Sequence, residues 1–266
     1  MKGRTVLVTG ASSGIGRATA LRFAGAGADL VLAARRQGRL EEVAAEVRGR
    51  GVRALAVGCD VTVGEDVERL LAATDREFGG LDVLVNNAGL INGPGPVAEL
   101  PLDEWRRVFE VNVFGLMRVT RAALPLLRRR AGAAIVNVSS VLGYRGLPLL
   151  GGYGASKAAV NALSESLRTE LAAEHIFVAV VSPGLTETEF RASRLSAEGY
   201  EQETLPLKAM SADDVARAIV QASRTGRRDT VLTLAGRAMV YGNRVAPALF
   251  DLVAGRMVGA PKEKGR

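Results

Sequence analysis

Apolar and polar positions along the chain follow two rhythms, short apolar runs and longer amphipathic stretches. The short runs have the length of strands, and the longer stretches repeat their apolar residues at the spacing of a helix. We expect seven strands, at Thr5–Val8, Asp29–Ala33, Arg53–Val57, Val83–Val85, Ala134–Val138, Phe177–Val181 and Val231–Leu234. We expect six helices, at Ile15–Gly25, Leu40–Val47, Val67–Phe78, Trp105–Leu124, Tyr153–Glu174 and Val215–Ser223.

Near-continuous apolar strands indicate a parallel sheet that is buried on both faces. Right-handed crossovers place the intervening helices on both sides of such a sheet. The pattern therefore predicts an α/β fold, a doubly wound parallel sheet of about seven strands with helices on both faces. The 266 residues fit a single domain over 1–266, because no repeat, low-complexity linker or charge run divides the chain.

Two segments fall outside this rhythm. Residues 187–210 are polar and irregular, and we expect them to form a substrate loop. Residues 237–266 are apolar but broken by glycine and proline, and we expect a substrate lid or a subunit contact there. This extension is too interrupted to cross a bilayer, which takes about 20 apolar residues, so no transmembrane segment is predicted. A helix lying on a membrane surface is the remaining alternative.

Composition excludes several classes of protein. Apolar residues make up 48% of the chain, which excludes a disordered protein. Cys59 is the one cysteine and His175 the one histidine, so we expect no disulfide and no metal site. The first apolar run is too short for a secretory leader, and we expect a cytoplasmic protein.

The net charge of +7 raises the question of a nucleic-acid partner. The arginines are spread along the chain, the longest basic run is residues 128–130, and aromatic residues make up only 5%. Because such a chain offers little base stacking and no basic stripe, we expect no nucleic-acid partner. Diffuse positive charge suits solubility or an anionic cofactor.

A glycine-rich turn, Thr9–Gly16, follows the first expected strand and opens the first expected helix. Gly10, Gly14 and Gly16 permit a tight turn and a close backbone approach. The N-terminus of the helix offers free N–H groups and a positive dipole to a pyrophosphate. The spacing G-x-x-x-G-x-G differs from the G-x-G-x-x-G dinucleotide fingerprint, and the position after the first strand is what favours a phosphate site.

The second expected strand ends in Ala34-Arg35-Arg36, where a site that reads a ribose 2′-OH would carry an acidic side chain. Arginines suit a 2′-phosphate, so we expect NADP rather than NAD. A solvated arginine pair is the alternative. Asp60, after the third strand, is expected to accept from an adenine amino group or to cap the helix that follows.

Tyr153 and Lys157 are four residues apart, which places a phenol and an ammonium on one face of a helix. A neighbouring cation favours the phenolate and lowers the pKa of a phenol. Ser140 follows the strand Ala134–Val138 and would bring a hydroxyl to the same point. Tyr-x-x-x-Lys alone is common on solvated helices, so its significance depends on the residues around it.

Together these residues resemble the short-chain dehydrogenase/reductase family across roughly the first 190 residues. The resemblance implies a Rossmann-type fold and a hydride-transfer enzyme. The motifs that carry it are Thr9-Gly-x-x-x-Gly-x-Gly16, Asp60, Asn86-Asn-Ala-Gly89, Asn112, Ser140, Tyr153-x-x-x-Lys157, and Pro183-Gly184 followed by Thr186 and Thr188.

By that resemblance, Tyr153 is the general acid in carbonyl reduction and the base in alcohol oxidation, with its pKa lowered by Lys157 and the oxidised nicotinamide. Ser140, a better match than Ser139, would hydrogen-bond the reacting oxygen. Lys157 would also hold the nicotinamide ribose, and Asn112 would hold a water that connects Lys157 to solvent. An asparagine satisfied by the backbone inside a helix is the alternative for Asn112.

The same resemblance implies a set of cofactor contacts. Asn86–Gly89 would support the sheet and lie along the cofactor, with an ordinary turn as the alternative. Pro183–Gly184 would lie beside the nicotinamide, and Thr188 would bond its carboxamide or a phosphate. The expected cofactor-binding residues are Gly10, Ser12, Ser13, Gly14, Ile15, Gly16, Arg35, Arg36, Asp60, Val61, Asn87, Ala88, Gly89, Tyr153, Lys157, Pro183, Gly184, Thr186 and Thr188.

We expect a hydrophobic small-molecule carbonyl or alcohol as substrate. The expected pocket walls are apolar or aromatic residues near the site, Leu90, Ile91, Leu142, Tyr144, Leu147, Leu149 and Phe190. The resemblance also implies a homodimer or homotetramer built on the helices Trp105–Leu124 and Tyr153–Glu174. Two alternatives stay open, a dinucleotide-binding sensor or scaffold without turnover and an NAD-dependent alcohol dehydrogenase of the same family.

Overall fold

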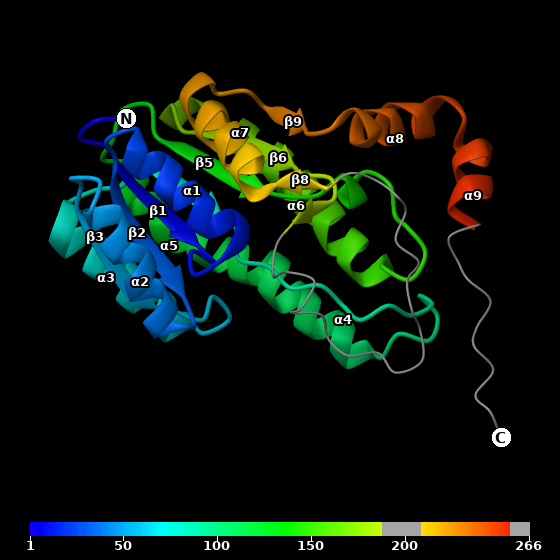
Figure 1. The fold of residues 1–266 in the computed structure, drawn as a ribbon, viewed down its shortest axis with the longest axis horizontal. Coiled ribbons are helices and arrows are strands. Elements are labelled where there is room, and N and C mark those ends of the chain that lie inside the picture. The colour runs from blue at the N-terminus through cyan, green and yellow to red at the C-terminus, as the bar shows by residue number, and fades with distance from the viewer. Residues whose placement is uncertain (188–208, 256–266) are drawn as a thin grey trace.

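A computed structural model of the protein describes residues 1–187 and 209–255. Seven parallel strands form the central sheet in the order β3-β2-β1-β4-β5-β6-β9 (Figure 1). The strands are β1 Thr5–Thr9, β2 Asp29–Ala34, β3 Ala54–Gly58, β4 Val83–Asn86, β5 Ala134–Val138, β6 Phe177–Ser182 and β9 Asp229–Val231. The doubly wound parallel sheet expected from the sequence is confirmed.

Helices cover both faces of this sheet. The α-helices of the body are α1 Gly14–Gly25, α2 Gln37–Arg48, α3 Gly64–Phe78, α4 Leu102–Phe109, α5 Leu116–Leu127, α6 Gly151–Glu170 and α7 Ala212–Thr225. Buried side chains of α1, α2 and α7 form one core cluster with the sheet, and those of α3, α5 and α6 form another on the opposite face. This segregation follows from the right-handed crossovers of a parallel sheet.

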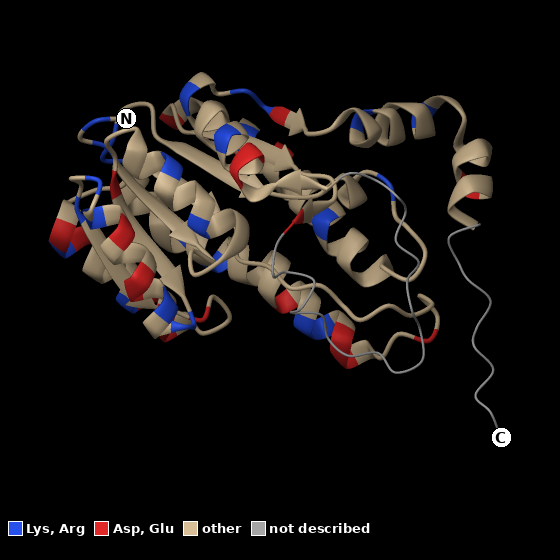
Figure 2. Cartoon of the chain, viewed as in Figure 1, with Lys and Arg blue, Asp and Glu red and all other residues tan. Residues whose placement is uncertain are grey.

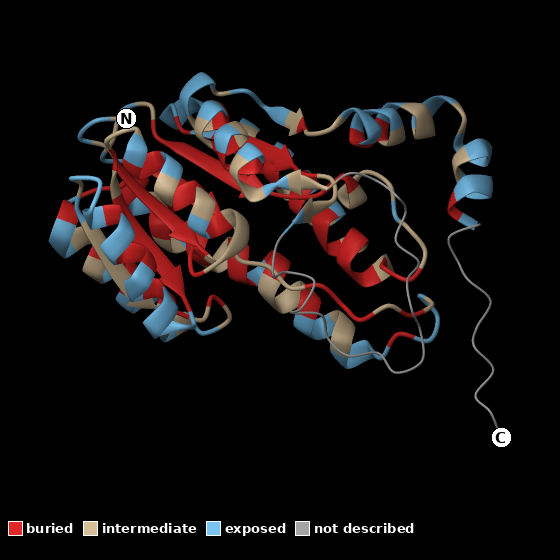
Figure 3. Ribbon diagram, viewed as in Figure 1, coloured by how far each residue is buried: buried red, intermediate tan, exposed pale blue. Residues whose placement is uncertain are grey.

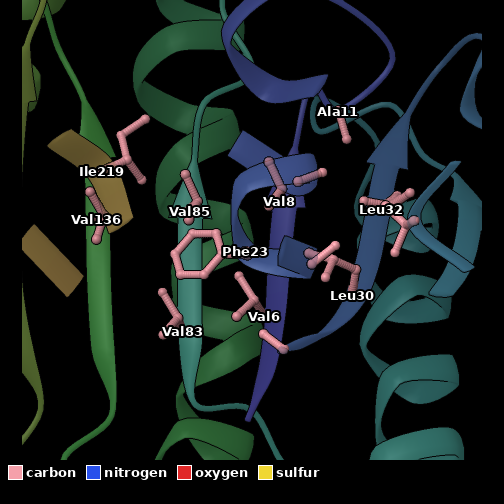
Figure 4. Close-up of a cluster of buried hydrophobic side chains, with 14 of the residues drawn as sticks. Val6, Val8, Ala11, Phe23, Leu30, Leu32, Val83, Val85, Val136 and Ile219 are labelled. Atoms are coloured by element: carbon pink, nitrogen blue, oxygen red, sulfur yellow. The ribbon is translucent and has the colours of Figure 1, made fainter. Parts of the chain in front are cut away.

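Alternate residues of each strand supply the two cores. In β1, Val6 and Val8 belong to one cluster and Leu7 to the other, because successive side chains of a strand point to opposite faces. Figure 4 shows Val6 and Val8 beside Phe23 of α1. The sheet is accordingly buried along its centre, as Figure 3 shows, so the elements that carry the site rest on a closely packed layer.

The strand order places a topological switch point between β1 and β4. From β1 the chain winds outward through β2 and β3, and it returns to the other side of β1 at β4. Ligands of open parallel sheets bind outside the carboxyl ends of the strands at such a point. The glycine-rich turn follows the carboxyl end of β1, and Asn87 follows that of β4.

Three local features differ from the sequence prediction. The helix expected at Trp105–Leu124 contains a π-helical segment, η1 Glu110–Gly115, between α4 and α5. The strand expected at Val231–Leu234 ends at Val231, because Thr233 caps a new helix by accepting a hydrogen bond from Gly236 N. A second, two-stranded parallel sheet pairs β7 Thr186–Glu187 with β8 Met210–Ser211.

Candidate active site

The glycine-rich turn is shaped by backbone conformations that disfavour other residues. Gly10 has a φ of 66° and Gly14 a φ of 52°, both in the left-handed region. A Cβ on Gly16 would lie 2.2 Å from the carbonyl oxygen of Gly10, so this position has no room for a side chain. Helix α1 begins at Gly14 without a side-chain cap or an acidic residue in its first turn. Its N-terminal amides therefore suit an anion.

Thr9 ties this turn to the segment after β4. Its Oγ1 accepts hydrogen bonds of 3.0 Å from the backbone N–H groups of Asn87 and Ala88. The Asn87 side chain donates in return to the carbonyl oxygens of Thr9 and Gly10. The two loops at the switch point are thus fixed to each other, with Gly89 directly after them.

Two arginines follow β2. Arg36 donates to the hydroxyls of Ser12 and Ser13 at 3.2 and 2.8 Å, so its guanidinium lies against the glycine-rich turn. Arg35 has a side chain that is 75% exposed and lies 3.9 Å from Asp60 Oδ2. Positive charge therefore gathers where the second strand meets the glycine-rich turn.

Asp60 does not cap helix α3, which was one of its two expected roles. Its Oδ1 accepts from both the N–H and the hydroxyl of Thr62, which closes a turn after β3. Val63 occupies the N-cap position of α3. The neighbouring Val61 is buried beside Gly115, and its carbonyl accepts from Arg118.

Ser140, Tyr153 and Lys157 come together beyond the end of β5. The Tyr153 hydroxyl shares a hydrogen bond with Ser140. The Lys157 Nζ donates to the carbonyl of Val138 at 2.9 Å and lies 5.7 Å from the centre of the Tyr153 ring. Ser139 turns away and donates to the Lys157 carbonyl, so of the serine pair only Ser140 faces the phenol.

Burial dominates the electrostatics of this cluster. Tyr153 is 9% exposed and Lys157 is 4% exposed. Burial raises the pKa of Tyr153 to about 12, although the hydrogen bond from Ser140 acts in the opposite direction. Burial lowers the pKa of Lys157 to about 8. The side chains in the described part of the chain therefore do not by themselves produce the lowered phenol pKa that the sequence led us to expect.

The surroundings of the phenol are apolar. Tyr153 belongs to a buried cluster with Ile91 and Leu150, and Leu142 packs against it. Ile91 and Leu142 were expected pocket walls. Tyr144, another of them, packs against a different cluster that contains Val141 and Val240. A desolvated phenol with apolar neighbours explains the direction of its pKa shift.

Asn112 lies in the π-helical segment and is 1% exposed. Its Oδ1 accepts from Leu90 N at 2.7 Å, and its Nδ2 donates to Leu90 O and to Ser156 Oγ. These bonds connect the loop after β4 to helix α6, which carries Tyr153. The Asn112 side chain thus bonds the Leu90 backbone and the Ser156 hydroxyl. This arrangement resembles the alternative role considered for Asn112, an asparagine inside a helix whose side chain is satisfied by the backbone. π-turns of this kind are frequent at functional sites.

Asn92 is a positioning residue that the sequence motifs do not reveal. It is fully buried, and its Oδ1 accepts from the backbone N–H of Tyr153 at 2.7 Å, in the first turn of α6. Its Nδ2 donates to Gly93 O and Leu149 O. Leu149 has a φ of 67°, which is uncommon for leucine and marks a constrained turn just before α6. The only signal in the sequence is an asparagine shortly after Asn86–Gly89.

The segments after β5 and β6 are also joined. Val141 N donates to Pro183 O at 3.0 Å, and Gly184 O accepts from Thr186 Oγ1. Gly184 lies close to Thr233, where a Cβ would meet the hydroxyl at 3.0 Å. Thr188 and Phe190, and nearly all of the expected substrate loop, lie outside the described residues.

The residues present fit a dinucleotide. The turn after β1 has glycines where Cβ atoms would clash and leaves the amides of α1 uncapped, as a pyrophosphate requires. The arginines after β2 suit an additional phosphate. Tyr153 and Lys157 lie at the same edge of the sheet, because Ser140 beside them follows the carboxyl end of the parallel strand β5.

Comparisons with known proteins agree with this geometry. The model of the short chain dehydrogenase family matches residues 4–199. Sulfoacetaldehyde reductase 2 of Chromohalobacter salexigens is 40% identical over 220 residues, which cover 80% of this chain and 86% of that protein.

Solved structures give the same result. A short-chain dehydrogenase/reductase from Burkholderia phymatum in complex with NAD has a TM-score of 0.82 and 30% identity, covering 94% of this chain and 95% of that one. An alcohol dehydrogenase from Thermococcus sibiricus complexed with 5-hydroxy-NADP has a TM-score of 0.76 and 29% identity, covering 86% and 95%. The chain belongs to the short-chain dehydrogenase/reductase family.

Proposed function

We propose that this protein is an NADP(H)-dependent oxidoreductase that interconverts a carbonyl and an alcohol on a hydrophobic small molecule. The observation that carries the proposal is the buried cluster in which the Tyr153 hydroxyl shares a hydrogen bond with Ser140 above the Lys157 ammonium. A reacting oxygen is protonated by a hydroxyl group that lies within hydrogen-bond reach, and a second hydroxyl and a nearby cation stabilise the charge that develops.

Tyr153 moves the proton. In the reducing direction its hydroxyl donates to the oxygen of the substrate, and in the oxidising direction its phenolate accepts the proton of the alcohol. Ser140 holds the reacting oxygen by a hydrogen bond and stabilises the charge that develops on it. A bound nicotinamide cofactor would supply or accept the hydride.

In this proposal Lys157 orients the cofactor and stabilises the phenolate of Tyr153, and it does not itself transfer the proton. Its ammonium lies one helical turn from Tyr153, and its partly lowered pKa leaves it charged at neutral pH. Together with an oxidised nicotinamide, this charge offsets the desolvation that raises the pKa of Tyr153. Lys157 would also hold the nicotinamide ribose. Asn112 positions α6 through Ser156 and the Leu90 backbone, and a water held nearby would complete a proton path to solvent.

The residues proposed to hold the cofactor follow the carboxyl ends of the strands. The glycine-rich turn with Ser12, Ser13 and Ile15 would bind the pyrophosphate, and Arg35 and Arg36 the 2′-phosphate. An acidic group able to bind a ribose 2′-OH is missing after β2, which favours NADP. The Burkholderia relative was solved with NAD, so NAD is the alternative cofactor.

We further propose a cytoplasmic homodimer or homotetramer built on the helices α4 to α6. Phe114, in the π-helical segment between α4 and α5, has 55% of its surface exposed, as expected of a side chain that is covered in an assembly.

A panel of ketones and aldehydes with NADPH tests the proposal. The wild-type protein should oxidise NADPH with at least one apolar carbonyl, and Tyr153→Phe should slow this reaction by at least about a hundredfold. A dinucleotide-binding sensor would bind NADPH without turnover on any carbonyl. Equal rates for the wild type and Tyr153→Phe would exclude the proposed proton transfer.

A further inference from the structure

Two helices at the carboxyl end of the described chain form an arm that is set apart from the body. We use the name C-terminal arm for residues 234–255, which comprise α8 Leu234–Val245 and α9 Pro247–Gly255. Figure 1 shows α8 and α9 extending beyond the end of β9, away from the helices that cover the sheet. Only Gly236, Val240 and Ala254 in this arm are buried.

Helix α8 has two opposite faces. Gly236 and Val240, one turn apart, face the body, where Val240 packs with Val141 and Val231. Residues 234, 238, 241 and 245 recur at helical spacing on the other side, and all four are exposed. The large members of this row are 82% (Leu234), 58% (Tyr241) and 86% (Val245) exposed. The helix therefore presents an apolar stripe outward.

Helix α9 carries a second exposed apolar row, which we include in the name stripe. Leu249, Leu252 and Val253 lie at helical spacing and are 57%, 58% and 47% exposed. The two helices thus contain six of the eleven exposed large apolar side chains in the described part of the chain. Because single exposed apolar side chains are ordinary but such a concentration is not, the stripe indicates an interaction surface.

One contact with the body and one between the two helices hold the arm in place. Arg145, five residues after Ser140, forms an ion pair of 2.5 Å with Asp251 of α9. Phe250 packs against α8 at Gly242, where a Cβ would lie 2.7 Å from its ring. The outward direction of the stripe is therefore set by specific contacts on its inner side.

Apart from Asp251, whose charge is paired with Arg145, the charged residues of the arm are all basic. Arg237, Arg244 and Asp251 are the charged residues between 234 and 255, and Asp251 is paired with Arg145. Arg237 and Arg244 are seven residues apart, on one side of the apolar row, and both are exposed. The Nε of Arg237 also donates to Val231 O at 3.1 Å. Figure 2 shows the basic residues of α8 in blue. An apolar stripe flanked by arginines is the signature of a helix that lies at a membrane surface.

We propose that the C-terminal arm docks on an anionic lipid surface, with the stripe in the acyl boundary and Arg237 and Arg244 at the headgroups. No helix in residues 1–187 or 209–255 is long and apolar enough to cross a membrane, so the arm would lie on the bilayer rather than span it. A second copy of the chain is a less suitable occupant, because an antiparallel pair of such stripes about a two-fold axis places the arginines of both copies on the same side. The proposal does not depend on the proposed reaction.

Sedimentation with vesicles tests it. Wild-type protein should sediment with phosphatidylglycerol vesicles and not with phosphatidylcholine vesicles. Exchange of three stripe residues, Tyr241→Ser, Val245→Ser and Leu249→Ser in one chain, should lower the affinity at least about tenfold. Arg237→Gln and Arg244→Gln should each lower it about fivefold.

A matched variant separates the stripe from the overall charge of +7. Val63→Ser, Leu102→Ser and Phe177→Ser exchange three apolar side chains on the body that are 40%, 69% and 51% exposed, and this variant should bind as the wild type does. Equal binding of the stripe variant and the wild type would overturn the proposal, since the net charge would then suffice.

The oligomeric state tests the alternative that a second copy of the chain covers the stripe. Light scattering without vesicles should give the same mass for the wild type and the stripe variant. Failure of the wild type to bind phosphatidylglycerol vesicles, together with an oligomer that the stripe variant dissociates, would show that a second copy covers the stripe. Circular dichroism and NADPH binding of each variant establish that it is folded, so a loss of binding to vesicles reports on the surface.

Discussion

Tyr153 and Lys157, beyond β5, are less than a tenth exposed, whereas the side chain of Arg35, beyond β2, is 75% exposed. Both groups lie at the carboxyl edge of one parallel sheet, so the scaffold is the same and the surroundings differ. Burial shifts the pKa of both Tyr153 and Lys157. The two arginines after β2 are exposed instead.

This difference indicates two ways of building a site. A proton donor needs desolvation and fixed neighbours, because its pKa and its distance to the substrate determine the rate. Recognition of a phosphate needs charge and hydrogen-bond donors, which also work at the surface, although with less energy for each contact. Substitutions at the catalytic end should therefore act on kcat, and those at the nucleotide end on the choice of cofactor.

Lys157→Met should have the largest effect in this set. Loss of the buried ammonium should lower kcat at least about a hundredfold, because it removes the neighbouring cation that favours the phenolate. Steady-state kinetics with NADPH would measure it. Arg168→Met, a control on the same helix further from Tyr153, should leave kcat within about twofold of the wild type by the same reasoning. A comparable fall in both variants would contradict the assignment.

The same substitution should stabilise the fold. The pKa of Lys157 falls from 10.5 to about 8 on folding, so the unfolded chain binds more protons between these values. The free energy of unfolding should thus rise with pH from about 8 to about 10.5, with a constant penalty below that window. Lys157→Met should raise the free energy of unfolding at pH 7 by about 2 kcal/mol, allowing for the lost bond to Val138 O. Urea denaturation measures it, and a less stable variant would contradict the argument.

Ser140→Ala should lower kcat about tenfold to a hundredfold, since it removes one hydrogen bond to the reacting oxygen. The bond from Ser140 lowers the pKa of Tyr153, so its loss should raise that pKa. The pH profile of alcohol oxidation should accordingly shift to higher pH. Ser139→Ala is the matched control, because Ser139 bonds the Lys157 carbonyl instead. A shift with Ser139→Ala and none with Ser140→Ala would reverse the assignment.

Arg35→Ala should reduce the preference for NADPH over NADH about tenfold, the value of one charge-assisted bond at an exposed position. Arg36→Ala should have a similar effect and also loosen the glycine-rich turn through Ser12 and Ser13. The ratio of kcat/KM for the two cofactors measures both. Arg50→Ala, an exposed arginine after α2, is the control. An unchanged ratio of kcat/KM for NADPH and NADH in Arg35→Ala would contradict the assignment of Arg35 to a 2′-phosphate site.

Asn112→Ala should have the smallest effect on the chemistry, a fall in kcat of about threefold to tenfold through misplacement of α6. Its effect on stability should be larger. The half-buried N–H and C=O of Leu90 would lose their partner, at a cost of about 2 kcal/mol. Thermal denaturation and kcat together test it. A large fall in kcat at unchanged stability would assign Asn112 a direct part in proton transfer.

Much of the scaffold follows from the sequence. Strand positions such as Ala134–Val138 are predicted correctly because buried parallel strands are continuous apolar runs. The π-helical segment around Asn112 is different. It accompanies hydrogen bonds to Leu90 and Ser156, which are distant along the chain, and local propensity does not contain them. The end of β9 is missed because the apolar run continues past Val231, while Thr233 caps the next helix.

The proposed catalytic residues are predicted by spacing, but their electrostatics are not. The four-residue spacing from Tyr153 to Lys157 predicts a shared helix face, and the structure places the ammonium near the ring. The direction of the pKa shift of Tyr153 depends on buried neighbours such as Ile91, which comes from the loop after β4. Desolvation is a property of the folded chain, so the spacing could not predict it.

Parallel measurement of NADPH binding and turnover in the wild type and Tyr153→Phe tests the central claim most directly. We predict that calorimetry will give dissociation constants within about twofold of each other, because the phenol hydroxyl is not needed to hold the nucleotide, while kcat on the best carbonyl falls at least about a hundredfold. Equal kcat values with equal binding would contradict the account, since Tyr153 would then not be the proton donor.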